Sequence, residues 1–486
     1  MSDMNLSIAA SGIAADTAEL DAASNNLSNV STPGYAAEQV NLSPEAAGGP
    51  LGTGQGVVIE SVSRLTDAVY MAANISALGV QGAAKQTDQV LKSIESIFPE
   101  PSNAGIASQL SAFWTDISTL ASNPNQIGAQ QAVVSAAETV AGSINSGYNQ
   151  MNQLSSSLQS EIGTGANDGG ALAQANALLS QVAHLNASIV AGSAGGQDVN
   201  ALMDQSNAAV NKLAALLGVS AVTAANGSVT VYLNGVQLVA GNSAQSLKST
   251  GSAATTNLGI ATSNGVAVDA GGTVGANLTA LNSTIPSYVD HLNSVADSLA
   301  TSLNTLQANG MDAKGDPGSA IAGSGWTGTV LPNIFVDNGS PGIYTPSPPG
   351  FDSAATIAVS PELLANPSLI ATASAPGAGN SNVIGTPTLD GTNAQAMAAV
   401  ASSPAGPDSN YQTMIGALGT EASNASAVSS TASNLASTAA SNLSSISGVN
   451  VNNEELDILA AQNAFQAVSR VVSALTTSFQ TLLQAV

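Results

Sequence analysis

An apolar residue recurs at every seventh position near both ends of this chain. Near the C-terminal end two such registers run three residues apart, and their members are Ile458, Ala461, Phe465, Val468, Val472, Leu475, Phe479, Leu482 and Val486. Near the N-terminal end the same spacing gives Leu6, Ile13, Leu20 and Leu27. Heptad spacing keeps one apolar stripe of a helix facing a partner helix along its whole length. We therefore predict two terminal helices that pack against each other and against neighbouring copies, as in an assembly protein.

The composition argues against several classes of function. Only 8% of the 486 residues are charged, and 7 basic residues face 31 acidic ones, which gives a net charge of −24. A chain with so few basic residues is unsuited to bind nucleic acid or an anionic membrane surface. No apolar run reaches the roughly 18 residues of a transmembrane helix. The first residues also lack the basic and apolar regions of a cleavable signal peptide.

Residues that could support catalysis or metal binding are sparse. Cysteine is absent, and His184 and His291 each stand alone in a helical apolar pattern. Asp290 precedes His291, but adjacent residues on a helix do not face each other. The segment 310–318 resembles a calcium-binding loop only loosely, because it lacks the closing glutamate. We therefore expect no catalytic residue, no metal, no cofactor and no small-molecule substrate, so the chain is not expected to be an enzyme.

The periodicity of apolar residues divides the chain into helical and β-rich parts. From Arg64 to Leu217 the period is 3.6, and the breaks contain proline or glycine, at 98–101, 123–125, 163–170 and 192–196. After Gly218 the period becomes two, and Asn234-Gly235 supplies the residues of a type I′ turn between two strands. A helix follows over 278–306, a second β-leaning block over 309–390, and helical sequence from 393 onward.

This order predicts a mainly α fold with an inserted β-rich domain. We expect a terminal coiled-coil domain from 1–34 plus 452–486, which would line an axis. A rod-like helical layer is expected from 35–217, 277–308 and 391–451, and an outer β-rich domain from 218–276 plus 309–390. Because the chain leaves through these layers and returns through them, both termini should lie at one pole.

The segment from Ser24 to Tyr35 is the most specific stretch of the chain. Its residues are those of a helix end, where side-chain amides can cap carbonyls and Pro-Gly stops the helix. The string also resembles the N-terminal signature of bacterial flagellar axial proteins, which reads roughly N-N-I-A-N-x-x-T-P-G-Y. The matching positions are Asn25, Asn26, Asn29, Thr32, Pro33, Gly34 and Tyr35.

A second signature stands near the other end of the chain. The residues from Gly448 to Leu456, followed by 462–467, are similar to G-V-N-x-D-E-E and Q-x-A-Y/F-Q-A of the same proteins. Locally the pattern is a helix start, for which we predict Asn452 as N-cap. The matching positions are Asn450, Glu454, Glu455 and Gln462.

Three internal segments resemble one family among these proteins, that of hook-associated protein 1. They are Phe98-Pro99-Glu100-Pro101 with Phe113-Trp114 and Asn123-Pro124, then 200–205, then 235–241. Charged residues of the family pattern are lost at Ser206-Asn207 and Ala36-Ala37, which places specific ion pairs in doubt.

The resemblance implies a structural subunit at the junction between flagellar hook and filament. Members are exported by the flagellar type III apparatus, without a cleaved signal peptide, and are extracellular. The implied partners are further copies in a ring, the hook protein, a second junction protein and an export chaperone. One alternative is another axial protein of the hook or rod, which is not expected to carry the helical block at 64–217. An alternative of another class is a secreted adhesin or phage fibre-like module, which gives no reason for heptads at both ends.

Overall fold

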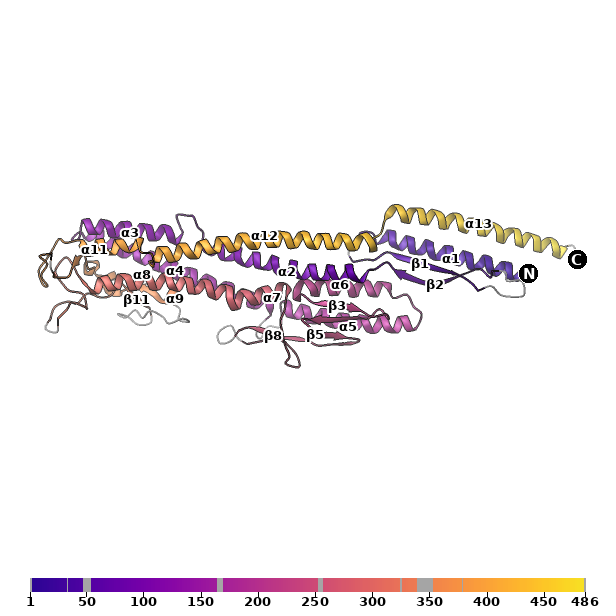
Figure 1. The fold of residues 1–486 in the computed structure, drawn as a ribbon, viewed down its shortest axis with the longest axis horizontal. Helices are drawn as coiled ribbons and strands as arrows, with labels where there is room; N and C mark the ends of the chain where they lie inside the picture. The colour runs from indigo at the N-terminus through magenta and orange to yellow at the C-terminus, as the bar shows by residue number, and fades with distance from the viewer. Residues whose placement is uncertain are drawn as a thin grey trace.

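The structure, a computed structural model, describes residues 2–32, 34–46, 54–163, 169–251, 257–323, 326–338, 353–377 and 379–484, apart from the side chains of 2–5 and 482–483. The described residues form a long rod of helices (Figure 1). Helix α1 (Ser2–Ser28) begins and helix α13 (Val451–Gln484) ends at the same pole of the rod. The shared pole agrees with the nested order of layers in the sequence.

Most of the rod consists of long helices that end where the sequence predicts breaks. They are α2 (Ala68–Ile97), α3 (Ile106–Ser122), α4 (Ile127–Ile162), α5 (Ala171–Ala194), α6 (Asn200–Leu217), α7 (Gly272–Thr279), α8 (Ile285–Ala308) and α12 (Pro407–Ser447). A π-helical segment, Ala280–Thr284, joins α7 to α8. Close approach depends on small residues, because a Cβ at Gly82 of α2 would overlap the carbonyl oxygen of Ala215 on α6.

A single large apolar core runs through the rod. The helix predicted over 278–306 is confirmed in α8, whose apolar stripe is buried at Ile285, Tyr288, Leu292, Val295, Leu299 and Leu303. Helix α12 lies along α2, where Ala77 packs with Ala436 and Ala439. No helix within the described ranges is both long and apolar enough to cross a membrane.

Two small antiparallel sheets follow α6. One has the order β3 (Ser220–Thr223), β4 (Val229–Leu233), β5 (Val236–Ala240) and β6 (Ser243–Ala244); the other contains β7 (Leu247–Thr250), β8 (Gly259–Thr262) and β9 (Ala267–Val268). Asn234 and Gly235 have φ values of 46° and 84°, so the predicted type I′ turn is confirmed.

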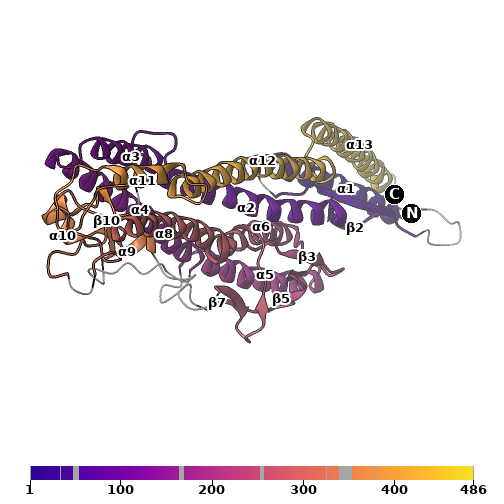
Figure 2. The ribbon, with the colours of Figure 1, turned by 60° about the vertical axis from the view of Figure 1, so that its left-hand side comes forward.

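The second β-leaning block lies elsewhere in the molecule. Strand β10 (Gly310–Met311) pairs with β13 (Ala373–Ser374), and β11 (Phe335–Asp337) pairs with β12 (Ile357–Val359). With α9 (Ser353–Thr356), α10 (Pro361–Ala365) and α11 (Thr392–Ala399), they occupy the pole opposite the chain ends (Figures 1 and 2). The blocks 218–276 and 309–390 form separate sheets, and they pack on different helices, the first chiefly on α2, α5 and α6 and the second chiefly on α3, α4 and α8.

A β-hairpin accompanies the terminal helices. Strand β1 (Glu38–Pro44) pairs with β2 (Val57–Arg64), and both contact α1. Strand β1 gives little periodic signal in the sequence, because it alternates polar residues with few apolar ones.

Candidate assembly interface

Helices α1 and α13 pack antiparallel along each other. The side-chain amide of Asn26 donates a hydrogen bond of 3.1 Å to the Glu454 carboxylate at one end of the contact. Further along, a Cβ at Gly12 would lie 3.6 Å from the Cγ2 of Val468. The same number of residues separates the two contacts in each helix, so the helices keep one register. The heptad stripes at opposite ends of the sequence therefore belong to neighbouring helices.

Most positions of the predicted seam lie at the contact or along its margin. The half-buried ones are Ile13, Leu20, Leu27, Ile458, Val468, Val472 and Leu475, while Leu6 is exposed. Phe465 and Phe479 remain 43% and 53% exposed. The side chain of Leu482 lies outside the described residues.

The buried apolar side chains of α1 are all small. They are Ala9, Ala15, Ala22 and Ala23. A single helix with such a surface cannot enclose a large ring on its neighbour, which explains why Phe465 stays partly exposed.

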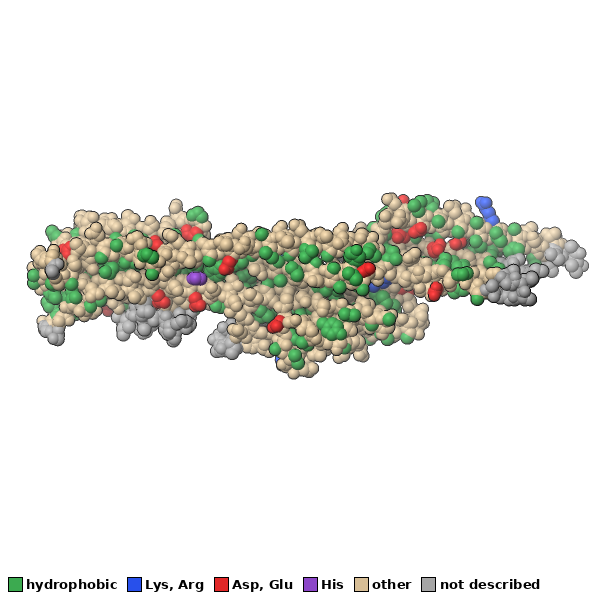
Figure 3. All heavy atoms as spheres, in the orientation of Figure 1, with side chains coloured by type: hydrophobic (Ala, Val, Ile, Leu, Met, Phe, Trp, Pro, Cys, Tyr) green, Lys and Arg blue, Asp and Glu red, His purple; other side chains and the backbone are tan. Residues whose placement is uncertain are grey.

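The outer faces of α13 carry further apolar side chains. Leu456, Leu459 and Val471 are exposed. On the neighbouring hairpin, Val58 and Ile59 are exposed as well. On the face seen in Figure 3, acidic side chains are sparse along the rod and more frequent over the terminal helices. This pole of the rod therefore offers exposed apolar side chains among acidic ones, and exposed apolar surface is typical of an interaction site.

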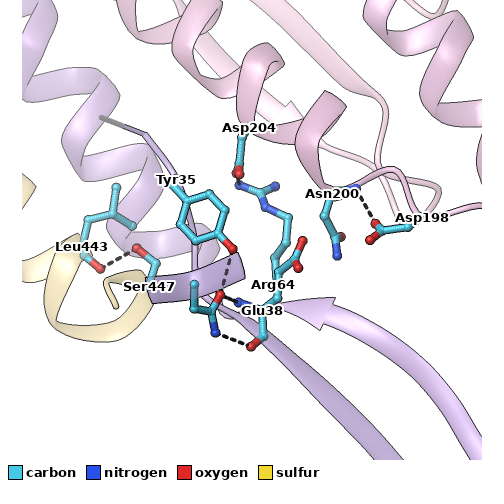
Figure 4. Close-up of polar contacts among 9 residues, drawn as sticks. Tyr35, Glu38, Arg64, Asp198, Asn200, Asp204, Leu443 and Ser447 are labelled. Atoms are coloured by element: carbon cyan, nitrogen blue, oxygen red, sulfur yellow. Dashed lines mark hydrogen bonds and ion pairs between the residues drawn. The ribbon is translucent and has the colours of Figure 1, made fainter. Parts of the chain in front are cut away.

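Asn26, the second asparagine of the N-terminal signature, joins three segments. Its side-chain oxygen accepts hydrogen bonds of 2.8 Å from the Tyr35 hydroxyl and from the Glu38 N–H. Its NH₂ group donates to the Glu38 carbonyl at 2.9 Å as well as to Glu454. Asn26 is 1% exposed, and Figure 4 shows Tyr35 and Glu38 converging on this point. The signature residue thus ties α1 to β1 and to the start of α13.

The rest of the N-terminal signature caps the end of α1. The Asn29 amide donates to the carbonyl oxygen of Asn25 at 3.0 Å, and the Thr32 hydroxyl donates to the Asn29 side chain at 3.2 Å. Gly34 has φ +84°, a left-handed conformation that favours glycine. Pro33 lies outside the described residues. The predicted capping of this helix end by amide side chains is confirmed.

The predicted N-cap of α13 is wrong by two residues. The side-chain oxygen of Asn450, not Asn452, accepts hydrogen bonds from the N–H groups of Asn452 and Asn453, at 3.1 and 3.4 Å. Either asparagine could cap a helix locally. With the N-cap at Asn450, Glu454 faces inward and is 9% exposed. Burial raises the pKa of the Glu454 carboxyl. Glu455 and Gln462 are exposed.

An ion pair connects the terminal elements to the rod. Arg64 on β2 pairs with Asp204 on α6, and their side chains are 8% and 15% exposed (Figure 4). Burial raises the pKa of Asp204 to about 6, against the opposing influence of Arg64. Nearby, the Ala37 N–H donates to the Ser447 carbonyl of α12 at 2.7 Å. In the described part of the chain, the other ion pair lies within α2.

The Asp204 of the internal segment 200–205 is therefore the partner of Arg64. Sequence reasoning did not pair these residues. The sequence offered one signal, because Arg64 is one of only seven basic residues in the chain.

The first internal motif has a structural role in the rod. The Glu100 carboxylate accepts hydrogen bonds from the Ala107 N–H at 3.1 Å and from the Tyr411 hydroxyl at 3.0 Å. The Trp114 indole donates to Asp408 at 2.7 Å. These contacts join α3 to the start of α12. Across the described ranges, no group of three or more histidine, aspartate or glutamate side chains is placed to hold a metal ion.

Comparison with known proteins gives matches to two family models. The helical domain of flagellar hook-associated protein FlgK matches residues 91–321, and the flagella basal body rod protein family matches residues 6–35. The second match ends at Tyr35, the last residue of the N-terminal signature. The first match covers a little under half of the chain.

Curated relatives carry the same family name. Flagellar hook-associated protein 1 of Bacillus subtilis (strain 168) is 28% identical over 252 residues, which are 47% of this chain and 48% of that protein. The protein of the same name from Escherichia coli (strain K12) is 27% identical over 331 residues, 64% of this chain and 58% of that protein. The chain thus spans about half the length of the curated relatives that it matches.

A solved structure shares the fold. The flagellar hook junction protein FlgK from Burkholderia pseudomallei superposes with a TM-score of 0.59 at 20% sequence identity, covering 78% of this chain and 100% of that one. Sequence signatures, family models and fold agree, and the chain belongs to the FlgK family of flagellar hook-associated proteins.

Proposed function

We propose that this chain is a structural subunit of the bacterial flagellum, placed at the junction between hook and filament, where it permits filament assembly. The observation that carries the proposal is the antiparallel packing of α1 and α13, which joins both signatures and leaves Phe465 and Phe479 partly exposed. In the proposed arrangement, the terminal helices form a coiled-coil layer around a central channel. The rod helices form the next layer, and β3 to β9 lie outside it.

The exposed apolar side chains favour assembly of several copies. Burial of a large apolar side chain contributes roughly 1.5–3 kcal/mol relative to full exposure. The apolar residues of α13 that are partly exposed are not fully buried within the subunit, so their further burial against another copy would stabilise that contact. A ring of subunits would repeat the gain at every interface.

The proposed partners are other copies of the chain, the hook protein, a second junction protein and, before export, a chaperone. The proposed route is the flagellar type III apparatus, and the proposed location is extracellular. The low charge, the absence of cysteine and the flagellar relatives support this set. A hook or rod protein is a weaker candidate because the FlgK helical domain matches 91–321. An adhesin or fibre module is not favoured by any of the family matches.

The location can be tested by immunogold electron microscopy in a strain that lacks the gene and is complemented with this chain. We expect gold particles at the boundary between hook and filament, and filaments restored by complementation. Label along the hook, or on a surface structure other than the flagellum, would contradict the proposal.

A further inference from the structure

A groove of about 880 Å³ lies where the terminal elements join the rod. Its walls come from α2, α6, α12 and β3, and its rim from the segment after α1 and from 447–449. Met71, Ile75, Val210 and Leu443 supply apolar surface. The one charged residue along it, Arg64, is paired with Asp204. The groove is therefore apolar and close to neutral.

Three asparagine side chains face this groove without a hydrogen-bond partner among the described residues. Asn74 of α2 is only 6% exposed, and Asn207 and Asn211 lie on one face of α6. Residues four apart on a helix lie about 5–6 Å from each other. Alternate residues of an extended chain repeat at roughly 6.6 Å. The two amides on α6 are thus spaced to meet alternate residues of an extended segment.

The rest of the fold shows what buried asparagine amides do here. In five places a helical asparagine accepts a hydrogen bond from the N–H of a residue in or beside a strand and donates one to the C=O of the same residue. The pairs are Asn26 with Glu38, Asn176 with Leu247, Asn186 with Val229, Asn282 with Leu258, and Asn304 with Phe335. In each, a helix holds an extended backbone. The amides in the groove lack such a backbone.

Strand β3 adds a second template for an extended chain. It is the edge strand of its sheet, and its residues line the groove. In an antiparallel pair, residues that hydrogen-bond to the partner strand alternate with residues that face away from it. The Ala224 N–H donates to the Ser228 carbonyl, so Val222, two residues earlier, also bonds to β4. Ala221 and Thr223 then direct their N–H and C=O groups away from the sheet. Such an unpaired edge can accept an added strand.

We infer that this groove binds an extended, uncharged segment of a second copy of this chain, laid beside β3 and held by Asn74, Asn207 and Asn211. The inference rests on the proposed self-assembly. The rim of the groove is continuous with the end of α1 and the start of α13, so a copy docked on those helices passes its mouth. The chain is also rich in uncharged segments, with 8% charged residues.

The absence of cysteine allows a direct test by site-specific cross-linking. Ala440→Cys, on the α12 wall, would carry a benzophenone maleimide in hook–filament preparations that contain equal amounts of light and ¹⁵N-labelled protein. Mass spectrometry of the irradiated material is expected to show cross-linked peptides of mixed isotope, which require two copies. A parallel probe, Leu456→Cys on the exposed face of α13, reports self-assembly alone.

The two probes separate the possible failures. In one outcome, Leu456→Cys gives mixed-isotope products, whereas Ala440→Cys gives only products within one copy or with another protein. This outcome would refute binding of a second copy in the groove and would leave the proposed function standing. Mixed-isotope products from neither probe would overturn both.

Variants identify the contacts that hold the segment. The double variant Asn74→Ala with Asn211→Ala is expected to lower the yield of mixed-isotope product from Ala440→Cys about tenfold. A tenfold loss corresponds to about 1.4 kcal/mol, the size expected for the lost hydrogen bonds. Ala221→Pro, which removes an outward N–H, should act in the same direction. Asn424→Ala, on α12 outside the groove, is the matched control. Equal yields in all variants, with unchanged circular dichroism, would refute the assigned contacts.

Discussion

Replacement of Asn26 by alanine is expected to release α1 from β1 and α13. The substitution removes four hydrogen bonds, to the Tyr35 hydroxyl, to the N–H and C=O of Glu38, and to Glu454. A hydrogen bond contributes about 0.5–1.5 kcal/mol net, and a buried group left without a partner costs about 1–3 kcal/mol. Because Tyr35 and Glu38 are partly accessible to water, we expect a loss of about 3–4 kcal/mol rather than the upper sum.

Hydrogen exchange followed by mass spectrometry measures this loss in the purified protein. Exchange in α1 and at the start of α13 should accelerate by up to two to three orders of magnitude, at about 1.4 kcal/mol for each tenfold. Asn25→Ala is the matched control, because Asn25 is exposed and its side chain bonds to the side chains of Glu38 and Asn29 rather than to α13. An equal response of Asn25→Ala and Asn26→Ala would refute the assigned role of the buried amide.

Three further outcomes are expected. Phe465→Ala should block filament growth beyond the hook in electron micrographs of complemented null strains, whereas Arg470→Ala should be nearly silent. Phe465 is 43% exposed in the subunit, and its burial against another copy would bring the cost of its loss toward the roughly 3–5 kcal/mol of a buried phenylalanine, against roughly 0–1 kcal/mol for an exposed charge. Asp204→Ala should lower the free energy of unfolding by roughly 3–5 kcal/mol in urea titrations, against less than about 1 kcal/mol for Lys92→Ala. Burial and neighbouring carboxylates raise the pKa of Glu19, so the packed helices hold its proton more tightly than separated ones. Pairing should therefore weaken as pH rises through that pKa, with a lower melting temperature of the terminal helices at about pH 7 than at about pH 4 and a smaller difference in Glu19→Gln.

Features governed by local chemistry could be predicted from the sequence. Asn234-Gly235 is confirmed as a type I′ turn because only residues that tolerate positive φ fit there. The breaks between rod helices fall at proline and glycine. The stripe on α8 is buried because its period matches the helix.

Features decided by distant partners could not be predicted. Asn26 and Glu454 are 428 residues apart, and nothing local indicates that one holds the other. Arg64 and Asp204 are 140 residues apart in the sequence and meet only in the folded chain. The same limit explains the error at the α13 cap, and why the sequence did not indicate on which helices the two β-rich blocks pack. Local patterns permitted several arrangements, and tertiary contacts selected one.

We propose that the two ends of the chain form one interface without which the subunit cannot join the flagellum. The decisive experiment is electron microscopy of a null strain complemented with the chain lacking residues 452–486. We expect the full chain to restore filaments beyond the hook, and the truncated chain to leave bare hooks although its rod still folds by circular dichroism. Filaments of normal number and length with the truncated chain would show that the paired ends are dispensable for assembly.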